Sequence, residues 1–136
     1  MKKKRLLDSY ALLAYLNKEA GFEKVLSILK KAEQSGPPVL MNDVNIGEMY
    51  YILSRKRGPE KADIFLDTIL PGLPITIISN GTDDVIDAAR IKAEYPLSFA
   101  DCFAAATARR EDAVVVTGDP EFSHIEHLVS IDWLNR

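Results

Sequence analysis

The residues that could do chemistry in this sequence are acidic, and two of them lie in the stretch 97–122. Asp101 is the only charged residue of the alanine-rich segment 97–108, whose composition is typical of a buried helix. A buried carboxylate without a partner is unstable, so it usually binds a partner or a cation, or takes up a proton. Asp119 follows the apolar run 113–116, which is typical of a buried parallel strand, and ligands bind beyond the carboxyl ends of such strands.

Two further acids occupy similar positions nearer the start of the chain. Asp8 directly follows a short predicted strand at 4–7, and Glu48 lies in the first turns of a predicted helix. Because the carboxyl ends of parallel strands meet at one edge of a sheet, we expect all four acids there. Two ionised carboxylates about 5 Å apart repel by roughly 3 kcal/mol at an effective dielectric near 20. Four of them therefore require raised pKa values or a cation.

The ligand type indicates which cation that would be. Sites built from oxygen atoms alone favour Mg²⁺ or Mn²⁺ over Zn²⁺, which prefers His and Cys. One or two such ions can activate a water and stabilise the leaving oxygen of a phosphodiester. The predicted chemistry is metal-dependent hydrolysis of a phosphodiester bond, which needs neither of the two histidines.

Each acid also has an ordinary structural explanation, because acidic residues often cap helices. The patterns that would do so are Asp8-Ser9-Tyr10, Asn45-x-x-Glu48, Ser98-x-x-Asp101 and Asp119-Pro120. The chemical hypothesis therefore depends on the four acids converging on one place.

The elements that must position these acids alternate along the chain. Strands are predicted at 4–7, 39–41, 75–78, 113–116 and 128–133, and helices at 8–16, 21–34, 45–58, 58–70, 82–94 and 97–108. Asn42 or Asn45 is expected to cap the third helix, and Thr82 the fifth. This order predicts an α/β fold of one domain over residues 1–136, with a four- to five-stranded parallel sheet and helices on both faces.

The composition is that of an ordinary globular domain. The 136 residues are 47% hydrophobic and 27% charged, with a net charge of −3, and a chain of this length buries about two-thirds of its unfolded surface. If four of the 20 acidic side chains bind metal, the other 16 are balanced by 17 basic ones. That balance permits a nucleic-acid partner. The basic run 55–57 ends a predicted helix, where it suits the helix dipole and could also bind phosphate.

The cysteine content and the start of the chain bear on localisation. Cys102 is the only cysteine, so no internal disulfide can form and a reducing compartment, the cytoplasm, is expected. The basic residues 2–5 resemble the start of a signal peptide, but the apolar run that follows stops at Asp8. No secretory core and no membrane span are therefore expected.

Four short motifs in this order resemble those of the PIN domain family, most closely the VapC-type toxins of prokaryotic toxin–antitoxin pairs. The matching elements are Leu6-Leu7-Asp8-Ser9, Asn45-x-x-Glu48, Leu97-Ser98-Phe99-Ala100-Asp101 and Val116-Thr117-Gly118-Asp119-Pro120-Glu121-Phe122. Each motif alone is common, whereas the four together, at these intervals, extend over essentially the whole chain. The resemblance implies a single PIN-like domain.

The resemblance also implies an activity and a set of residues for it. The activity is that of a Mg²⁺-dependent endoribonuclease, in which Mn²⁺ substitutes for Mg²⁺. The implied metal-binding and catalytic acids are Asp8, Glu48, Asp101 and Asp119, with Thr117, Ser9, Asn45 and Glu121 as polar groups around them. RNA is the implied substrate, and a second copy of the chain and a small antitoxin protein are the implied partners.

Two residues depart from the usual pattern of that family. Family members often have a small polar residue where Tyr10 stands and an aspartate where Glu121 stands. Both positions are at the expected periphery of the site, so they concern its shape and the role of Glu121 more than its chemistry.

Other functions are less consistent with the sequence. The main alternative is a catalytically inactive PIN-like module that binds RNA or protein, although such a module has little reason to keep four acids. A haloacid-dehalogenase-type site would need an aspartate where Tyr10 stands, and the P-loop pattern is absent. His124 and His127 lack a third ligand, and Cys102 is expected to be inert packing rather than a nucleophile.

Overall fold

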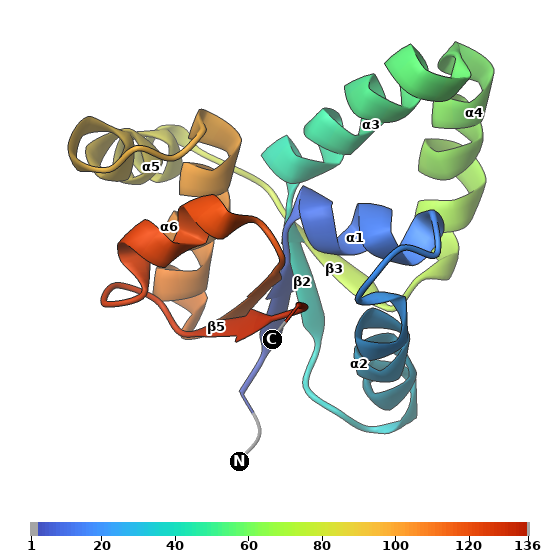
Figure 1. Ribbon diagram of the computed structural model, residues 1–136, viewed down its shortest axis with the longest axis horizontal. Helices are drawn as coiled ribbons and strands as arrows, with labels where there is room; N and C mark the ends of the chain where they lie inside the picture. The colour runs from blue at the N-terminus through green and yellow to red at the C-terminus, as the bar shows by residue number, and fades with distance from the viewer. Residues whose placement is uncertain (1–2, 136) are drawn as a thin grey trace.

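In the computed structural model, which describes residues 3–135, five parallel strands form one sheet with helices on both faces (Figure 1). The strands are β1 (Arg5–Leu7), β2 (Val39–Asn42), β3 (Ile75–Ile78), β4 (Val114–Thr117) and β5 (Ile131–Trp133). Their order across the sheet is β3-β2-β1-β4-β5, and every neighbouring pair is parallel. The predicted α/β fold is confirmed.

Helical segments connect each strand to the next. They are α1 (Ser9–Leu16), α2 (Phe22–Gln34), α3 (Asp43–Arg57), α4 (Pro59–Ile64), α5 (Thr82–Glu94) and α6 (Phe99–Glu111). A π-helical segment (Phe65–Ile69) and a 3-10 turn (Leu70–Gly72) follow α4, and a second 3-10 segment (Pro120–Ile125) follows β4. Within residues 3–135, every helix is too short or too polar to cross a lipid bilayer.

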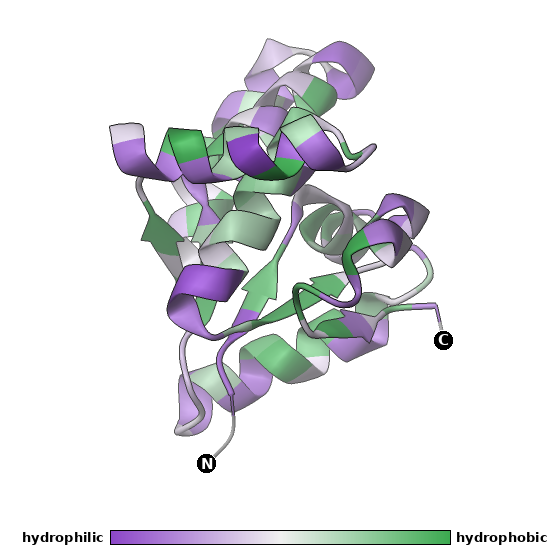
Figure 2. Ribbon diagram, turned by 90° about the vertical axis from the view of Figure 1, so that its left-hand side faces the viewer, coloured by the Kyte–Doolittle hydropathy of each residue, from purple (hydrophilic) through white to green (hydrophobic). Residues whose placement is uncertain are grey.

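The sheet separates two hydrophobic clusters, because successive residues of a strand point to opposite faces. Leu6 and Val115 pack with α5 and α6 on one face, whereas Leu7 and Val116 pack with α1, α2 and α3 on the other. Figure 2 shows the hydrophobic strands enclosed by helices with mixed polar and apolar residues. Burial on both faces explains why the run at 113–116 is apolar without alternation.

The strand order creates a crevice between β1 and β4. From β1 the chain adds β2 and β3 on one side and then returns to add β4 on the other side. Where the direction of connection reverses in this way, a crevice opens beyond the carboxyl ends of the two strands. Asp8 directly follows β1, and its backbone N–H donates to the carbonyl of Val116 in β4 at 3.5 Å.

The helix predicted at 58–70 is an α-helix only as far as Ile64. The chain then changes to the wider π register, in which the backbone N–H of Leu70 donates to the carbonyl of Phe65. Both of these side chains are buried. A spacing of five residues brings them to one side of the helix in the π register, which the 3.6-residue α period would not do.

Two other predicted boundaries are wrong for local reasons. Helix α5 is capped by Gly81 rather than Thr82, because the carboxylate of Asp84 accepts the backbone N–H of Gly81 at 2.8 Å. Strand β5 begins at Ile131 rather than Leu128. The backbone N–H of Leu128 donates at 2.9 Å to the carbonyl of Ile125, so that segment forms a turn.

Candidate functional site

Asp8 is held at the end of β1 by hydrogen bonds to both of its carboxylate oxygens. As the N-cap of α1, Oδ1 accepts the backbone N–H of Ala11 at 2.8 Å, and Oδ2 accepts the Thr117 hydroxyl. The residue is 1% exposed. Burial raises the pKa of Asp8 from 3.8 to about 7; the two hydrogen bonds oppose this rise, and the charges of Asp119 and Glu48 add to it. Asp8 therefore caps α1 and is at the same time a buried acid in the crevice.

Thr117 joins the ends of β1 and β4. Its hydroxyl donates to Asp8 and accepts the backbone N–H of Asp119 at 3.0 Å. Asp119 in turn caps the following 3-10 segment by accepting the backbone N–H of Glu121 at 3.0 Å. One buried hydroxyl therefore fixes the position of Asp8 relative to the turn that carries Asp119.

Asp101 lies in the first turn of α6, where the cap does not satisfy its carboxylate. The Ser98 hydroxyl accepts the backbone N–H of Asp101 at 3.2 Å, which is one half of a capping box. The Oδ2 atom of Asp101 is buried and has no hydrogen-bond partner among the described residues. Burial, and then the charges of Asp119 and Asp8, raise the pKa of Asp101 to about 9. A buried acid in this state requires a proton or a cation.

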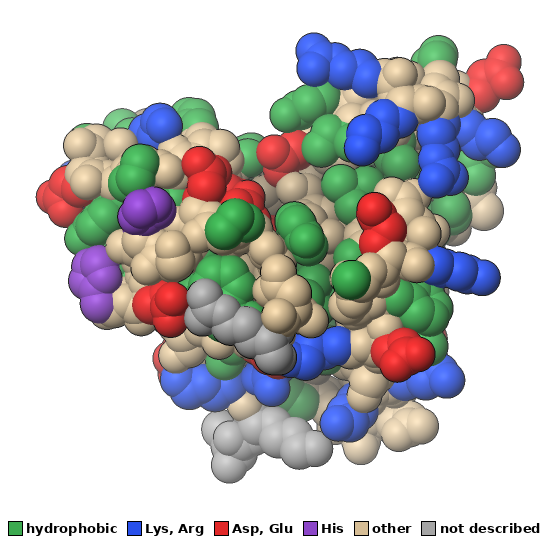
Figure 3. Space-filling model, viewed as in Figure 1, with side chains coloured by type: hydrophobic (Ala, Val, Ile, Leu, Met, Phe, Trp, Pro, Cys, Tyr) green, Lys and Arg blue, Asp and Glu red, His purple; other side chains and the backbone are tan. Residues whose placement is uncertain are grey.

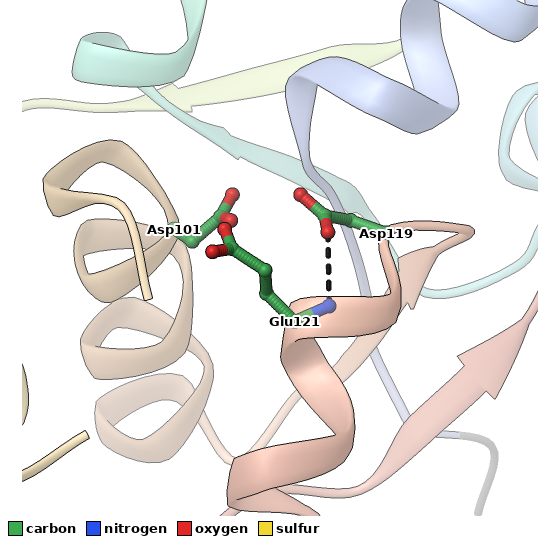
Figure 4. A group of neighbouring side chains, drawn as sticks. All are labelled: Asp101, Asp119 and Glu121. Carbon is green, nitrogen blue, oxygen red and sulfur yellow. Dashed lines mark hydrogen bonds between the residues drawn. The ribbon is translucent and has the colours of Figure 1, made fainter. Parts of the chain in front are cut away.

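Three acids form the centre of the cluster. Asp101, Asp119 and Glu121 each place one carboxylate oxygen within 4.8 Å of the other two. Figure 4 shows the three side chains pointing toward a common centre, from α6 and from the turn and 3-10 segment that follow β4. Glu121, which was expected at the periphery, lies beside Asp101 and Asp119, because the cap formed by Asp119 holds it there.

Glu48 approaches Asp8 from α3 and, like Asp8, is not one of the three acids at the centre. Asn42 caps that helix, with Oδ1 accepting the backbone N–H of Val44 at 2.8 Å, so Asn45 and Glu48 do not form the alternative capping box. Glu48 instead accepts a hydrogen bond from the Ser9 hydroxyl. Its charge raises the pKa of Asp8, which places Glu48 on the Asp8 side of the cluster.

Asn45 connects α3 to the start of α6. Its Nδ2 donates to the carbonyl of Ala100, the residue before Asp101, at 3.2 Å. Its Oδ1 is buried and, like the Oδ2 atom of Asp101, has no hydrogen-bond partner in the described part of the chain. Two buried oxygens without donors thus occur at the junction of α3 and α6, a pattern that calls for an additional donor or a cation.

The residues around this centre fit a hard divalent cation. Their ligand atoms are oxygens, three of them lie within 4.8 Å of one another, and one of these acids has a buried oxygen without a donor. That set suits Mg²⁺ or Mn²⁺. Zn²⁺ suits it less, because both histidines are exposed and burial raises the pKa of the Cys102 thiol to about 11.

Comparisons with known proteins agree with this architecture. A solved DNA-bound VapBC from Salmonella typhimurium superposes with a TM-score of 0.73 and 18% identity, covering 98% of this chain and 99% of that chain. VapC20 of Mycobacterium tuberculosis, described as a sarcin-ricin loop cleaving toxin, has a TM-score of 0.70 and 18% identity over 88% of this chain and 92% of that chain. FitAcB from Neisseria gonorrhoeae has a TM-score of 0.69 and 20% identity over 93% and 95% of the two chains.

These structural likenesses, at 18–20% identity, establish a shared fold. The family model of the PIN domain matches residues 5–128, which is most of the chain. The chain therefore belongs to the PIN domain family.

Proposed function

We propose that this protein is a metal-dependent endoribonuclease and the toxin of a toxin–antitoxin pair. The observation that carries the proposal is the acidic cluster beyond β1 and β4, in which the buried Asp101 keeps an oxygen without a donor while Asp119 and Glu121 are half-buried. Membership of the PIN domain family supports it. So does the likeness to VapC20, which is described as cleaving the sarcin-ricin loop.

The ion would be Mg²⁺, with Mn²⁺ as a substitute, held by Asp8, Glu48, Asp101 and Asp119, and we add Glu121 to this set because of its proximity. When bound, such an ion supplies an activated water and neutralises charge on the leaving oxygen of a phosphodiester. A cation there would also offset the burial and the mutual repulsion that raise the pKa of Asp8 and Asp101.

The other polar residues of the site would hold these acids in place. The Thr117 hydroxyl sets the distance between Asp8 and the turn after β4. The Ser9 hydroxyl orients Glu48, and Asn45 ties α3 to α6. Such groups fix ligand geometry before the substrate arrives, which matters because small displacements of reacting groups lower the rate strongly.

The RNA backbone would be attracted by basic residues at one end of the molecule. Arg55, Lys56 and Arg57 end α3, and all three are exposed. Figure 3 shows Lys and Arg side chains gathered at the far end of α3 and α4, and acidic side chains between that part and the half that holds α5 and α6. Phosphates bound at the basic end would lead the strand toward the acidic centre.

The remaining proposals concern the binding partners of the protein and its localisation. Similar structures include toxin–antitoxin complexes, among them one from Klebsiella pneumoniae, so a small antitoxin protein is the proposed regulator. Exposed apolar residues after α3, such as Ile64 and Leu66, would suit its contact. We further propose a homodimer of single-domain chains acting in the cytoplasm.

The direct test incubates the purified protein with a mixed RNA pool in Mg²⁺, in Mn²⁺ and in EDTA. Cleavage in the presence of either ion, abolished by EDTA, is the expected result. A protein that binds RNA in a filter assay but cuts none of the pool with either ion would be the inactive binding module instead.

A further inference from the structure

Tyr10 is an exposed aromatic side chain at the rim of the acidic centre. It lies in the first turn of α1, two residues after Asp8, and is 42% exposed. Its ring rests on Gly118, where an added Cβ atom would come within 2.3 Å of Tyr10 Cε1. Because Gly118 lies between Thr117 and Asp119, the ring is fixed on the backbone of the turn that carries two residues of the site. Its hydroxyl makes no hydrogen bond within residues 3–135.

The same ring lines a small hollow beside the site. This hollow of about 280 Å³ is formed by Tyr10, Leu13, Ala14, Glu19 and Ala20. Its lining combines the apolar side chains of Leu13, Ala14 and Ala20 with polar groups, among them the Tyr10 hydroxyl and the exposed Glu19. The Oε1 atom of Glu19 accepts a bond from Asn17 at 3.4 Å, and no described residue donates to Oε2. The hollow is smaller than the pockets that bind drug-sized ligands, which suits a single aromatic ring.

An unpaired nucleobase matches this combination of groups. Proteins that bind single-stranded RNA stack its bases on aromatic side chains and bond to their Watson–Crick edges. Tyr10 borders both the hollow and the turn of Asp119, so its ring adjoins the acidic centre on one side and the hollow on the other. The carboxylate of Glu19 repels phosphate, so the base rather than the backbone would enter the hollow.

The acceptor-only chemistry of a carboxylate favours one base. Ionised Glu19 offers two oxygens and no donor. Guanine presents two adjacent donors, N1–H and the N2 amino group, on its Watson–Crick edge. Adenine and cytosine present one amino donor beside an acceptor nitrogen, and uracil presents one N–H between two carbonyls, so each of these would also place an acceptor against the carboxylate.

We propose that the hollow between Tyr10 and Glu19 binds an unpaired guanine of the RNA substrate, and so determines where the RNA is cut. Tyr10 stacks on the base, and Glu19 accepts hydrogen bonds from N1–H and the N2 amino group. This inference rests on the proposed ribonuclease function.

The first experiment maps cleavage sites and kinetics on oligonucleotides that differ in one base. Wild type is expected to cut next to guanine. Loss of stacking in Tyr10→Ala should raise KM for the guanine substrate roughly 5- to 150-fold, whereas Tyr10→Phe should retain the wild-type KM. Glu19→Gln should lose the preference for guanine over adenine. The controls are Ile86→Ala, a similarly exposed side chain on α5, and Glu23→Gln in α2, neither of which lines the hollow.

The second experiment measures base binding without catalysis. Guanosine, adenosine, cytidine and uridine, which carry no phosphate, are titrated into the protein in EDTA and followed by NMR. Guanosine is expected to shift resonances of residues 10–20 most, and Glu19→Gln is expected to remove that difference.

The two experiments separate failure of this inference from failure of the proposed function. If RNA is cut without regard to guanine, or if Tyr10→Ala keeps the wild-type KM and cleavage pattern, the guanine site is wrong and the nuclease stands. If no RNA is cut but guanosine binds selectively, the nuclease is wrong and the base site stands. If the four nucleosides bind equally or not at all, the base site is overturned.

Discussion

Asp8 at the end of β1 and Asp101 at the start of α6 face the same crevice, but their carboxylates differ in the hydrogen bonds that they accept. Asp8 has a donor for each carboxylate oxygen, whereas Asp101 has a buried oxygen with none. Burial is the main cause of the raised pKa of both, which is about 7 for Asp8 and about 9 for Asp101. The position of Asp8 is thus secured by protein groups alone, while Asp101 is destabilising until a proton or a cation reaches it.

The strongest test of this difference is Asp101→Asn. We expect RNA cleavage to fall by roughly 100-fold or more, because the proposed metal site would lose a charged ligand at its centre. In EDTA the variant should be at least as stable as wild type, since asparagine is neutral without taking up the proton that buried Asp101 needs. The stabilisation by Mg²⁺, about 2.7 kcal/mol at 100 times the dissociation constant for wild type, should shrink. Thermal melts in EDTA and in Mg²⁺, alongside a cleavage assay, measure all three.

The matched control is Ser98→Ala, which removes the cap of α6 and keeps every acidic side chain, although it also removes a hydrogen bond from Ser98 that lowers the pKa of Asp101. It should lower stability by about 0.5–2 kcal/mol with both EDTA and Mg²⁺ while activity is kept. If Asp101→Asn behaves like this control, melting lower in EDTA and cutting RNA at the wild-type rate, then Asp101 is only part of the cap.

The stability of the metal-free protein should also depend on pH, because both acids have a raised pKa in the folded state. The folded-state pKa of Asp8 and Asp101 lies above the ordinary 3.8, so between these values the folded protein holds protons that the unfolded chain releases. The free energy of unfolding in EDTA should therefore fall as pH rises, by roughly 3 kcal/mol from Asp8 alone between pH 5 and 9. Asp101 should extend the fall toward pH 9.

Denaturant titrations at pH 5, 7 and 9 measure this trend. In the proposed site Mg²⁺ would bind the ionised acids, so its addition should reduce or reverse the fall. Asp101→Asn should show a smaller fall than wild type because it lacks one of the two groups. A metal-free stability that stays level from pH 5 to 9 would mean that these acids are not strained by burial.

The same contrast explains how far the sequence could predict the site. Asp8 and Asp119 were predictable because topology alone decides where a strand ends: both follow an apolar run, and the order β2-β1-β4 makes those ends neighbours. The side on which Glu48 and Glu121 point was not predictable in this way. It depends on which residue caps each helix, and Asn42 rather than Asn45 caps α3.

The boundaries of helices and strands were predictable from the sequence only in part, for a similar reason. Strand positions were predicted to within a residue or so, except for β5, because continuous burial leaves an unbroken apolar run. The change of register between Phe65 and Leu70 leaves no such mark, since both an α-helix and a π-helix present apolar residues at short intervals. Gly81 caps α5 through the side chain of Asp84, a bond that depends on tertiary placement rather than on the residue at the cap.

Glu121 tests whether the centre extends beyond the four predicted acids. Glu121→Gln keeps the size of the side chain and removes its charge, so it should raise the Mg²⁺ concentration for half-maximal cleavage roughly tenfold. Glu121→Asp should be milder, since it keeps the charge. Activity is measured against Mg²⁺ concentration, with Glu33→Gln on the exposed part of α2 as the control. If activity depends on Mg²⁺ concentration in the same way for Glu121→Gln and wild type, Glu121 does not bind the ion.

The smallest expected effect concerns the two histidines, and it bears directly on the mechanism. His124 and His127 are exposed, and His127 pairs with the Tyr95 hydroxyl at 3.0 Å. A ribonuclease that used the RNA 2′-hydroxyl as nucleophile would need an acid and a base of this kind. Hydrolysis by an activated water does not, so the double variant His124→Ala, His127→Ala should cut RNA at the wild-type rate. It should lose only the small stabilisation from the Tyr95 contact.

The products of both proteins, analysed by mass spectrometry, should carry 5′-phosphate and 3′-hydroxyl ends. Ends with a 2′,3′-cyclic phosphate, or loss of activity in the double variant, would move the chemistry away from the acidic crevice and toward a histidine mechanism.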